Sequence, residues 1–193
     1  MTTLTFALLV LVSALGNPSS QSVSGNGQIG RSDPADVFAI YLVTEPVDGR
    51  LIGYGKGDWS HLRLAPSPLV SADDIISYDF SKHAMRLQPA ALARIPKAVP
   101  GTPGSLIHGV PFVVLARGQR VYLGVFVSPL SSVSFAVPSI YLEPQLLDPT
   151  LPKDVLIIGA PFPSISGDVR PDPRGDERVK TALAALHKLK SDR

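Results

Sequence analysis

The chain has 193 residues, of which 45% are hydrophobic and only 18% charged, and its formal net charge is +2. A chain of this length can bury a substantial core, and this composition favours a packed domain over wholesale disorder. No segment concentrates Lys and Arg with interleaved aromatic residues, so we expect no nucleic-acid partner. The chain has no cysteine, which excludes disulfides, thiolate catalysis and thiolate metal sites.

An apolar stretch at residues 4–15 has the length of the central region of a secretory signal and is too short to span a bilayer. Small residues at Ala14 and Gly16 suit a signal peptidase, so residues 1–16 are predicted to be a signal peptide. No Lys or Arg precedes the stretch, and the alternatives are an uncleaved anchor or a buried strand. We expect an extracytoplasmic protein, periplasmic or secreted, without a stable membrane span after cleavage.

A linker is predicted between the signal and the folded region. Residues 17–35 are rich in Ser, Gly, Asn and Gln, which is typical of a disordered segment. Residues 36–193 remain as one globular domain.

The first half of this domain contains short strands separated by turns. Ser71 and Asp74 have the spacing of an N-cap and an acidic residue at the third helical position, which predicts a helical turn over 72–76. Pro89 stands at the first position of an Ala-rich segment, which predicts a two-turn helix over 88–95 that ends at the next proline. The predicted strands cover residues 37–43, 76–80 and 84–87, and the predicted loops cover residues 50–68 and 97–108.

The centre of the predicted fold is a hairpin over residues 109–129. Residues 111–116 form an unbroken apolar run, short enough to be a strand that is buried on both faces. Gly118, between Arg117 and Gln119, can take the positive φ of a tight turn. The return strand, residues 120–127, alternates Val121, Leu123, Val125 and Val127 with Tyr122, Gly124 and Phe126.

The C-terminal part is predicted to contain two strands and a long helix. Residues 135–142 indicate an edge strand, because Pro138 cannot donate a backbone hydrogen bond, and residues 154–158 indicate a last buried strand. A helix over residues 174–190 is predicted from apolar residues at helical spacing, namely Val179, Leu183, Leu186 and Leu189.

These elements together predict an α+β fold. In it a mostly antiparallel sheet, centred on the 109–129 hairpin, is covered by the C-terminal helix and by one or two short helices.

Five residues are candidate binding residues. An aromatic face at Trp59 can stack on a ligand, and an acidic residue can orient an imidazole. The structural alternatives are a tryptophan that holds its loop on the sheet, and an Asp and His that flank a solvated turn. The five candidates are Tyr54, Trp59, His61, Asp79 and His83.

No cofactor, metal site or catalytic residue is predicted. The four histidines, at positions 61, 83, 108 and 187, lack the close helical spacing of a pair of metal ligands. The sequence contains no nucleophile elbow and no phosphate-binding glycine loop in a strand-to-helix context.

The order of a first strand, an acidic segment with a small hairpin and helix, and a strand–turn–strand unit resembles a known family. It is similar to the extracytoplasmic head region of the SecD subunit of the bacterial protein-export machinery. The resemblance covers roughly residues 37–132 and rests on Ala72-Asp73-Asp74 and on Arg117-Gly118-Gln119 flanked by strands. Inserts at residues 50–65 and 97–108 depart from it. It implies a small α+β scaffold outside the cytoplasm, with no catalytic residues to transfer.

The expected function is recognition of a protein or peptide, or a role in assembly, because the loops are rich in Pro, Gly and aromatic residues without a convergent acid, base and nucleophile. This hypothesis predicts an exposed apolar patch that involves Tyr54, Trp59 or Phe162. The alternative is an extracytoplasmic enzyme whose site lies near residues 73–83, built from Asp73, Asp74, Asp79 and His83.

Overall fold

The computed structural model describes residues 37–99, 103–162 and 171–190, all of which lie in one compact unit that covers residues 32–193. The predicted signal peptide and linker lie outside the described residues. Within the described part, no helix combines the length and apolar character that a membrane span requires.

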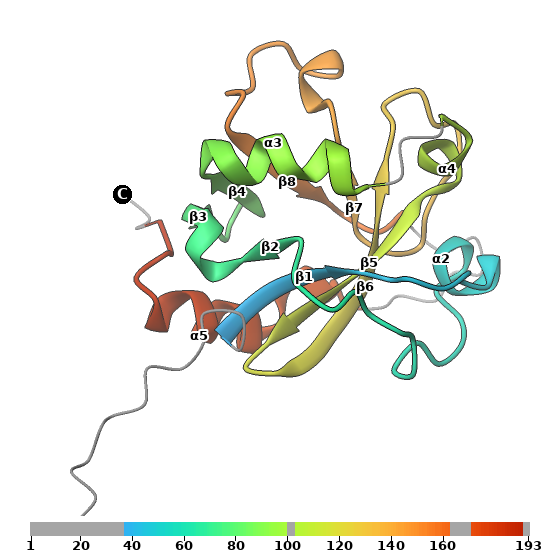
Figure 1. Cartoon of the computed structure of the whole chain (residues 1–193), viewed down its shortest axis with the longest axis horizontal. Helices are drawn as coiled ribbons and strands as arrows, with labels where there is room; N and C mark the ends of the chain where they lie inside the picture. Colours follow the sequence, from blue (N-terminus) through green and yellow to red (C-terminus); the bar gives the residue numbers. More distant parts are fainter. Residues whose placement is uncertain (1–36, 100–102, 163–170, 191–193) are drawn as a thin grey trace, which may run out of the picture. The chain divides into compact units, whose positions relative to one another are not determined.

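Eight strands form one mixed sheet in the order β2-β1-β5-β6-β7-β8-β4-β3 (Figure 1). Neighbouring strands are antiparallel except β6 and β7, which are parallel. The strands are β1 (Phe38–Leu42), β2 (Val70–Ser71), β3 (Ile75–Asp79), β4 (Ala84–Leu87), β5 (Val110–Ala116), β6 (Gln119–Val127), β7 (Ser139–Tyr141) and β8 (Val155–Gly159).

Four short helices accompany the sheet in the described ranges, together with three single 3₁₀ turns. The helices are α2 (Gly49–Gly53), α3 (Pro89–Ala98), α4 (Pro103–His108) and α5 (Glu177–Ala185). The 3₁₀ turns are η1 (Ala72–Asp74), η2 (Pro144–Leu146) and η3 (Pro173–Gly175).

The sheet curls nearly into a barrel because its two outermost strands are joined by η1 alone. The turn is held by the predicted cap: Asp74 Oδ2 accepts hydrogen bonds from the Ser71 backbone N–H at 2.8 Å and from its hydroxyl at 3.1 Å. Arg94 of α3 also donates to Asp74, at 2.7 Å, and to the Leu69 carbonyl, at 2.9 Å. These contacts fix the direction in which the chain passes from β2 to β3.

The predicted hairpin is confirmed as β5 and β6, joined at Arg117 and Gly118, which both have positive φ. Its inner face belongs to the main core with Phe112 and Phe126, whose rings lie 4.8 Å apart. Its outer face belongs to a second apolar cluster, which includes Leu123. Both faces are therefore packed, as the run of apolar residues predicted.

The predicted fold class is wrong, because the sheet is mixed and nearly closed and is not covered by a C-terminal helix. Helix α5 is short, and its buried residues, Val179, Ala182 and Leu183, are part of the main core. The chain after it joins the sheet: the Tyr78 N–H donates to the Lys188 carbonyl at 2.7 Å, and the Lys190 N–H donates to the Tyr78 carbonyl at 2.8 Å.

Several element boundaries also differ from the predictions. The segment 135–142 contributes only β7, which lies between β6 and β8 and is not an edge strand. Pro138 precedes β7, and its carbonyl accepts from the Val125 N–H at 2.9 Å, so the proline needs no donor there. Helix α3 runs through Pro96, and α4 lies in the predicted loop 97–108.

Candidate functional site

The five predicted site residues do not converge. Tyr54 follows α2 and is 57% exposed, and His61 is exposed beside Asp58, with 3.8 Å between Nδ1 and Oδ2. Asp79 and His83 lie at the turn between β3 and β4. Among the described residues, no three His, Asp or Glu side chains are grouped so that they could hold a metal ion.

Trp59 is half-buried and packs against the apolar cluster on the outer face of the hairpin. Arg120 of β6 holds its loop, since the guanidinium donates to the Trp59 carbonyl at 3.4 Å and to the Leu62 carbonyl at 2.7 Å. Trp59 therefore anchors its loop to the sheet, as the structural alternative to ligand stacking predicted.

The acidic residues near His83 serve the turns. Asp79 accepts from the Ser81 hydroxyl at 2.7 Å and from the Lys82 N–H at 3.1 Å, and the Ser81 bond is the main reason that its pKa is lowered. Asp74 caps η1, and Asp73 is exposed. These carboxylates are occupied by structural hydrogen bonds or solvated, and none of them is hydrogen-bonded to His83.

The surroundings of His83 include Tyr78 and two charged residues from a distant part of the chain, Arg174 and Asp172. Its Nδ1 lies 3.4 Å from the Tyr78 hydroxyl. Burial, followed by the charge of Arg174, lowers the pKa of His83, while Asp172 and Asp79 oppose the shift. Arg174 bonds Asp172, and that hydrogen bond is the main reason that the pKa of Asp172 is lowered. Sequence reasoning missed this group, because no local pattern links a turn at residue 83 to a segment near residue 172.

This environment predicts a pH-dependent contribution to stability. Since the pKa of His83 is lower in the folded state, its neutral form is favoured there, and the contribution is complete above the unfolded pKa of about 6.5. It is lost as the pH falls from there through the folded pKa. We expect His83→Asn to flatten the decline of the free energy of unfolding between pH 7 and pH 5, measured by urea denaturation.

Asn suits this test because it tolerates the positive φ of 48° at position 83. At pH 8, the difference in the free energy of unfolding between His83→Asn and the wild type gives the part of the effect that does not depend on the titration of His83. Identical slopes below pH 7 in the variant and the wild type would contradict the assignment.

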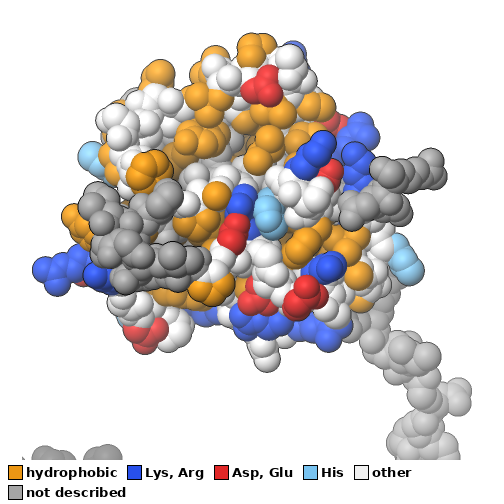
Figure 2. Space-filling model, turned by 180° about the vertical axis from the view of Figure 1, so that it is seen from behind, with side chains coloured by type: hydrophobic (Ala, Val, Ile, Leu, Met, Phe, Trp, Pro, Cys, Tyr) orange, Lys and Arg blue, Asp and Glu red, His pale blue; other side chains and the backbone are white. Residues whose placement is uncertain are grey.

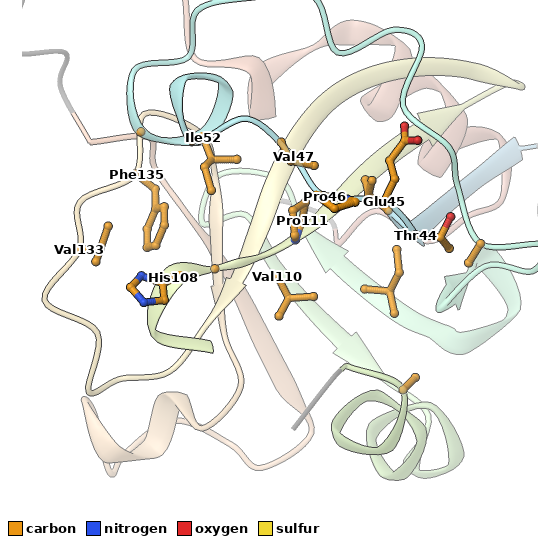
Figure 3. Close-up of a pocket in the computed structure, with 17 residues that line it drawn as sticks. Thr44, Glu45, Pro46, Val47, Ile52, His108, Val110, Pro111, Val133 and Phe135 are labelled. Atoms are coloured by element: carbon orange, nitrogen blue, oxygen red, sulfur yellow. The ribbon is translucent and has the colours of Figure 1, made fainter. Parts of the chain in front are cut away.

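A pocket of about 980 Å³ lies where the end of β1, the start of β5, α2 and the end of α4 meet (Figure 3). Its size is in the range of ligand sites. The lining residues are mostly apolar or glycine: Leu42, Val43, Thr44, Glu45, Pro46, Val47, Gly49, Ile52, Gly53, Ala65, Ala98, His108, Gly109, Val110, Pro111, Val133 and Phe135.

The polar groups of this pocket stand at its two ends. In Figure 3, Glu45 and Thr44 lie at one end, and His108 lies at the other, near Val133 and Phe135. The Glu45 carboxylate accepts from the Arg63 N–H at 2.7 Å, which holds it outside the apolar centre. The carboxylate of Glu45 and the imidazole of His108 therefore stand at opposite ends of the apolar wall.

Large apolar side chains remain exposed around this pocket. Val133, which lines it, is 41% exposed, and Phe162 is 56% exposed. The Phe162 N–H donates to the carbonyl of the lining residue Phe135 at 2.7 Å, and Tyr54 follows the lining residues of α2 directly. The sequence predicted an exposed apolar patch that involves Tyr54, Trp59 or Phe162. Tyr54 and Phe162 are exposed, whereas Trp59 is half-buried, and the pocket itself was not predicted.

The opposite view of the molecule shows a different surface (Figure 2). Acidic and basic side chains are interspersed on this face, with hydrophobic side chains exposed between them.

No protein-family model matches the chain, and no curated protein or solved structure matches it either. The resemblance to the SecD head region and the extracytoplasmic location therefore stay predictions.

Proposed function

We propose that this protein is an extracytoplasmic binding module that takes an apolar segment of a protein or peptide into the pocket between α2, α4 and the ends of β1 and β5. The observation that carries the proposal is the pocket itself, with its apolar wall and the uncovered side chains beside it. Folded monomers rarely leave adjoining apolar groups exposed unless something binds there.

The chemistry of the wall favours recognition by shape and hydrophobic contact. No Lys or Arg is among the lining residues, so an anionic amphiphile would find no counter-ion, whereas an uncharged apolar segment needs none. The free side chain of His108 at one end can hydrogen-bond to a peptide group of such a segment, since no described residue bonds to it.

The alternative function, an enzyme with a site near residues 73–83, receives no support from the contacts there. Asp74 and Asp79 are engaged in turn-forming hydrogen bonds, and Asp73 points to no partner in the described part of the chain. A reaction at these positions would lack a paired general acid and base.

The test is a variant that adds a side chain to the pocket wall. We expect Gly53→Leu to raise the Kd of a pocket-binding peptide at least about ten-fold, because the new side chain takes up room in the pocket. A Cβ at Gly53 meets nothing within 4 Å, so the fold itself is expected to tolerate it. The peptide is first selected from a random library displayed on phage, and its Kd is then measured by the fluorescence of Trp59, the only tryptophan of the chain.

The matched control is Gly175→Leu. A Cβ at this glycine also meets nothing within 4 Å, and η3 does not line the pocket. We expect the selected peptides to be rich in Leu, Ile, Val and Phe and to bind this control as they bind the wild type. Selection of no peptide, or an equal loss of affinity in both variants, would refute the proposal.

A further inference from the structure

A second apolar feature of the surface lies in the loop between β7 and β8. The 3₁₀ turn η2 and the residue after it expose two consecutive leucines: Leu146 is 65% exposed and Leu147 is 56% exposed. No other two of the large exposed hydrophobic residues in the described part of the chain are adjacent in sequence. In Figure 1 this loop, drawn in orange, extends away from the sheet and lies apart from α2. We call the two leucines the leucine knob.

Hydrogen bonds within the loop hold the leucine knob in place. Its two backbone N–H groups donate to the carbonyls of Glu143 and Pro144, each at 3.0 Å. The Nε2 of Gln145 donates to the Pro152 carbonyl at 3.3 Å, which ties the turn to the opposite side of the loop. A turn that is already ordered loses little conformational entropy when a partner covers it, so the knob is suited to binding.

Acidic residues stand on both sides of the leucine knob. Glu143 and Asp148 are exposed, and neither forms an ion pair with a described residue. Asp148 accepts hydrogen bonds from the Thr150 N–H at 2.9 Å and from its hydroxyl at 2.6 Å, which fixes the carboxylate near the knob. Lys153, the one cation of this loop, lies at its base, two residues before β8. The loop thus presents an apolar pair between two negative charges.

The surroundings of the apolar pocket carry the opposite charge. Arg50 and Lys97 are exposed, each is directly next in the chain to a lining residue, and neither forms an ion pair with a described residue. The acids nearby are already engaged. Glu45 lies 3.8 Å from the Arg63 guanidinium, and Asp48 accepts from the Arg50 N–H at 2.9 Å. The pocket therefore combines an apolar wall with two cations beside it.

We propose that the pocket takes the leucine knob of a second copy of this chain, so that the protein associates with itself. This inference rests on the proposed function, because it names the partner of the same pocket. Two leucines suit a wall that offers mainly apolar contact, and the acids beside the knob match the cations beside the pocket. Because the knob and the pocket are different surfaces, a single contact leaves a knob unused on one copy and a pocket unused on the other.

The test is the self-association of the full chain, measured by sedimentation velocity at pH 8. A contact of this size is weak, so concentrations up to about 1 mM are used. The knob variant combines Leu146→Asn and Leu147→Asn, and the pocket variant is Gly53→Leu. Both are expected to fold, because the leucines are exposed and a Cβ at Gly53 meets nothing within 4 Å.

We expect the wild type to associate as its concentration rises, and each variant alone to associate with a Kd at least about five-fold higher. An equimolar mixture of the two variants is expected to form a 1:1 dimer with a Kd close to that of the wild type, because the knob variant still has its pocket and the pocket variant still has its knob. This mixture also shows that both variants are folded.

Two further measurements complete the experiment. Gly175→Leu, the matched control outside the pocket, is expected to associate as the wild type does. Raising the NaCl concentration from about 50 mM to about 500 mM is expected to raise the Kd of the wild type at least about two-fold, because salt screens interactions between exposed charges.

Four results would overturn the inference. These are a wild type that stays monomeric, association that neither variant weakens, a mixture of the variants that stays monomeric, and a Kd that does not change with salt. Peptide binding separates this inference from the proposed function. If the selected peptides bind a wild type that stays monomeric, the pocket binds apolar segments as proposed, and only the second copy as its partner is wrong.

Discussion

Replacing Gly124 by alanine is expected to destabilise the protein by about 3 kcal/mol, the upper end of the usual cost of overpacking a core. A Cβ at this position would lie 2.3 Å from Phe112 Cζ and 2.8 Å from the Pro138 carbonyl oxygen. The ring is itself buried against Phe126, and the carbonyl belongs to the backbone, so neither can withdraw easily. For a protein of this size the melting temperature should fall by roughly 6–12 °C, measured by circular dichroism.

The matched control is Gly49→Ala. A Cβ there meets nothing within 4 Å, and the residue is the first of α2, so the change is expected to be neutral or slightly stabilising. If Gly124→Ala melted within 2 °C of the wild type, the close approach of Phe112 to β6 would not exist in the folded protein.

The second large effect is expected for Leu183→Ala, which should cost about 2–5 kcal/mol. Leu183 is fully buried in the main core, although it stands on the last helix of the chain. Its removal leaves a cavity between α5 and the strands that it contacts, β1 and β5. Urea denaturation should show a lower midpoint with an unchanged slope.

The same substitution at Leu146 separates burial from residue type. Leu146 is 65% exposed, so Leu146→Ala is expected to change the free energy of unfolding by less than about 0.5 kcal/mol. Similar values for the two variants would mean that Leu183 is not part of the core.

Local signals in the sequence were sufficient for elements whose partners are close along the chain. The β5–β6 hairpin has a glycine turn and two apolar runs, and the η1 turn has its cap from Ser71 to Asp74. In both cases the hydrogen bonds that stabilise the element lie within a few residues of the pattern. The hairpin was predicted correctly for that reason, and the turn was predicted at the right place but two residues too long, because residues 75 and 76 belong to β3.

Pairing between distant segments could not be predicted in this way. The parallel pairing of β6 with β7 requires a crossover connection. The spacing of apolar residues in a strand does not show which strand it pairs with. Helix α5 was predicted to begin at residue 174 but begins at Glu177, where Asp176 accepts a hydrogen bond from the Arg178 N–H at 2.8 Å and caps the helix. The helix was predicted too long because its apolar spacing continues after its end.

The same difference between local signals and contacts of distant segments applies to the candidate sites. Exposed aromatic residues such as Tyr54 and Phe162 could be recognised because they stand in loops rich in glycine and proline. The pocket could not be recognised, since its lining residues come from loops, helices and strand ends that are far apart in the sequence.

The contact of residues 188–190 with Tyr78 has a consequence for self-association. An open strand edge is a template on which another chain can pair, and a curled sheet that stops short of closure leaves two such edges. Here β2 is only two residues long, and the outward backbone groups of Tyr78 are bonded to the last described segment of the chain. Residues 188–190 thus occupy the backbone groups of β3 with which a strand from another chain could pair.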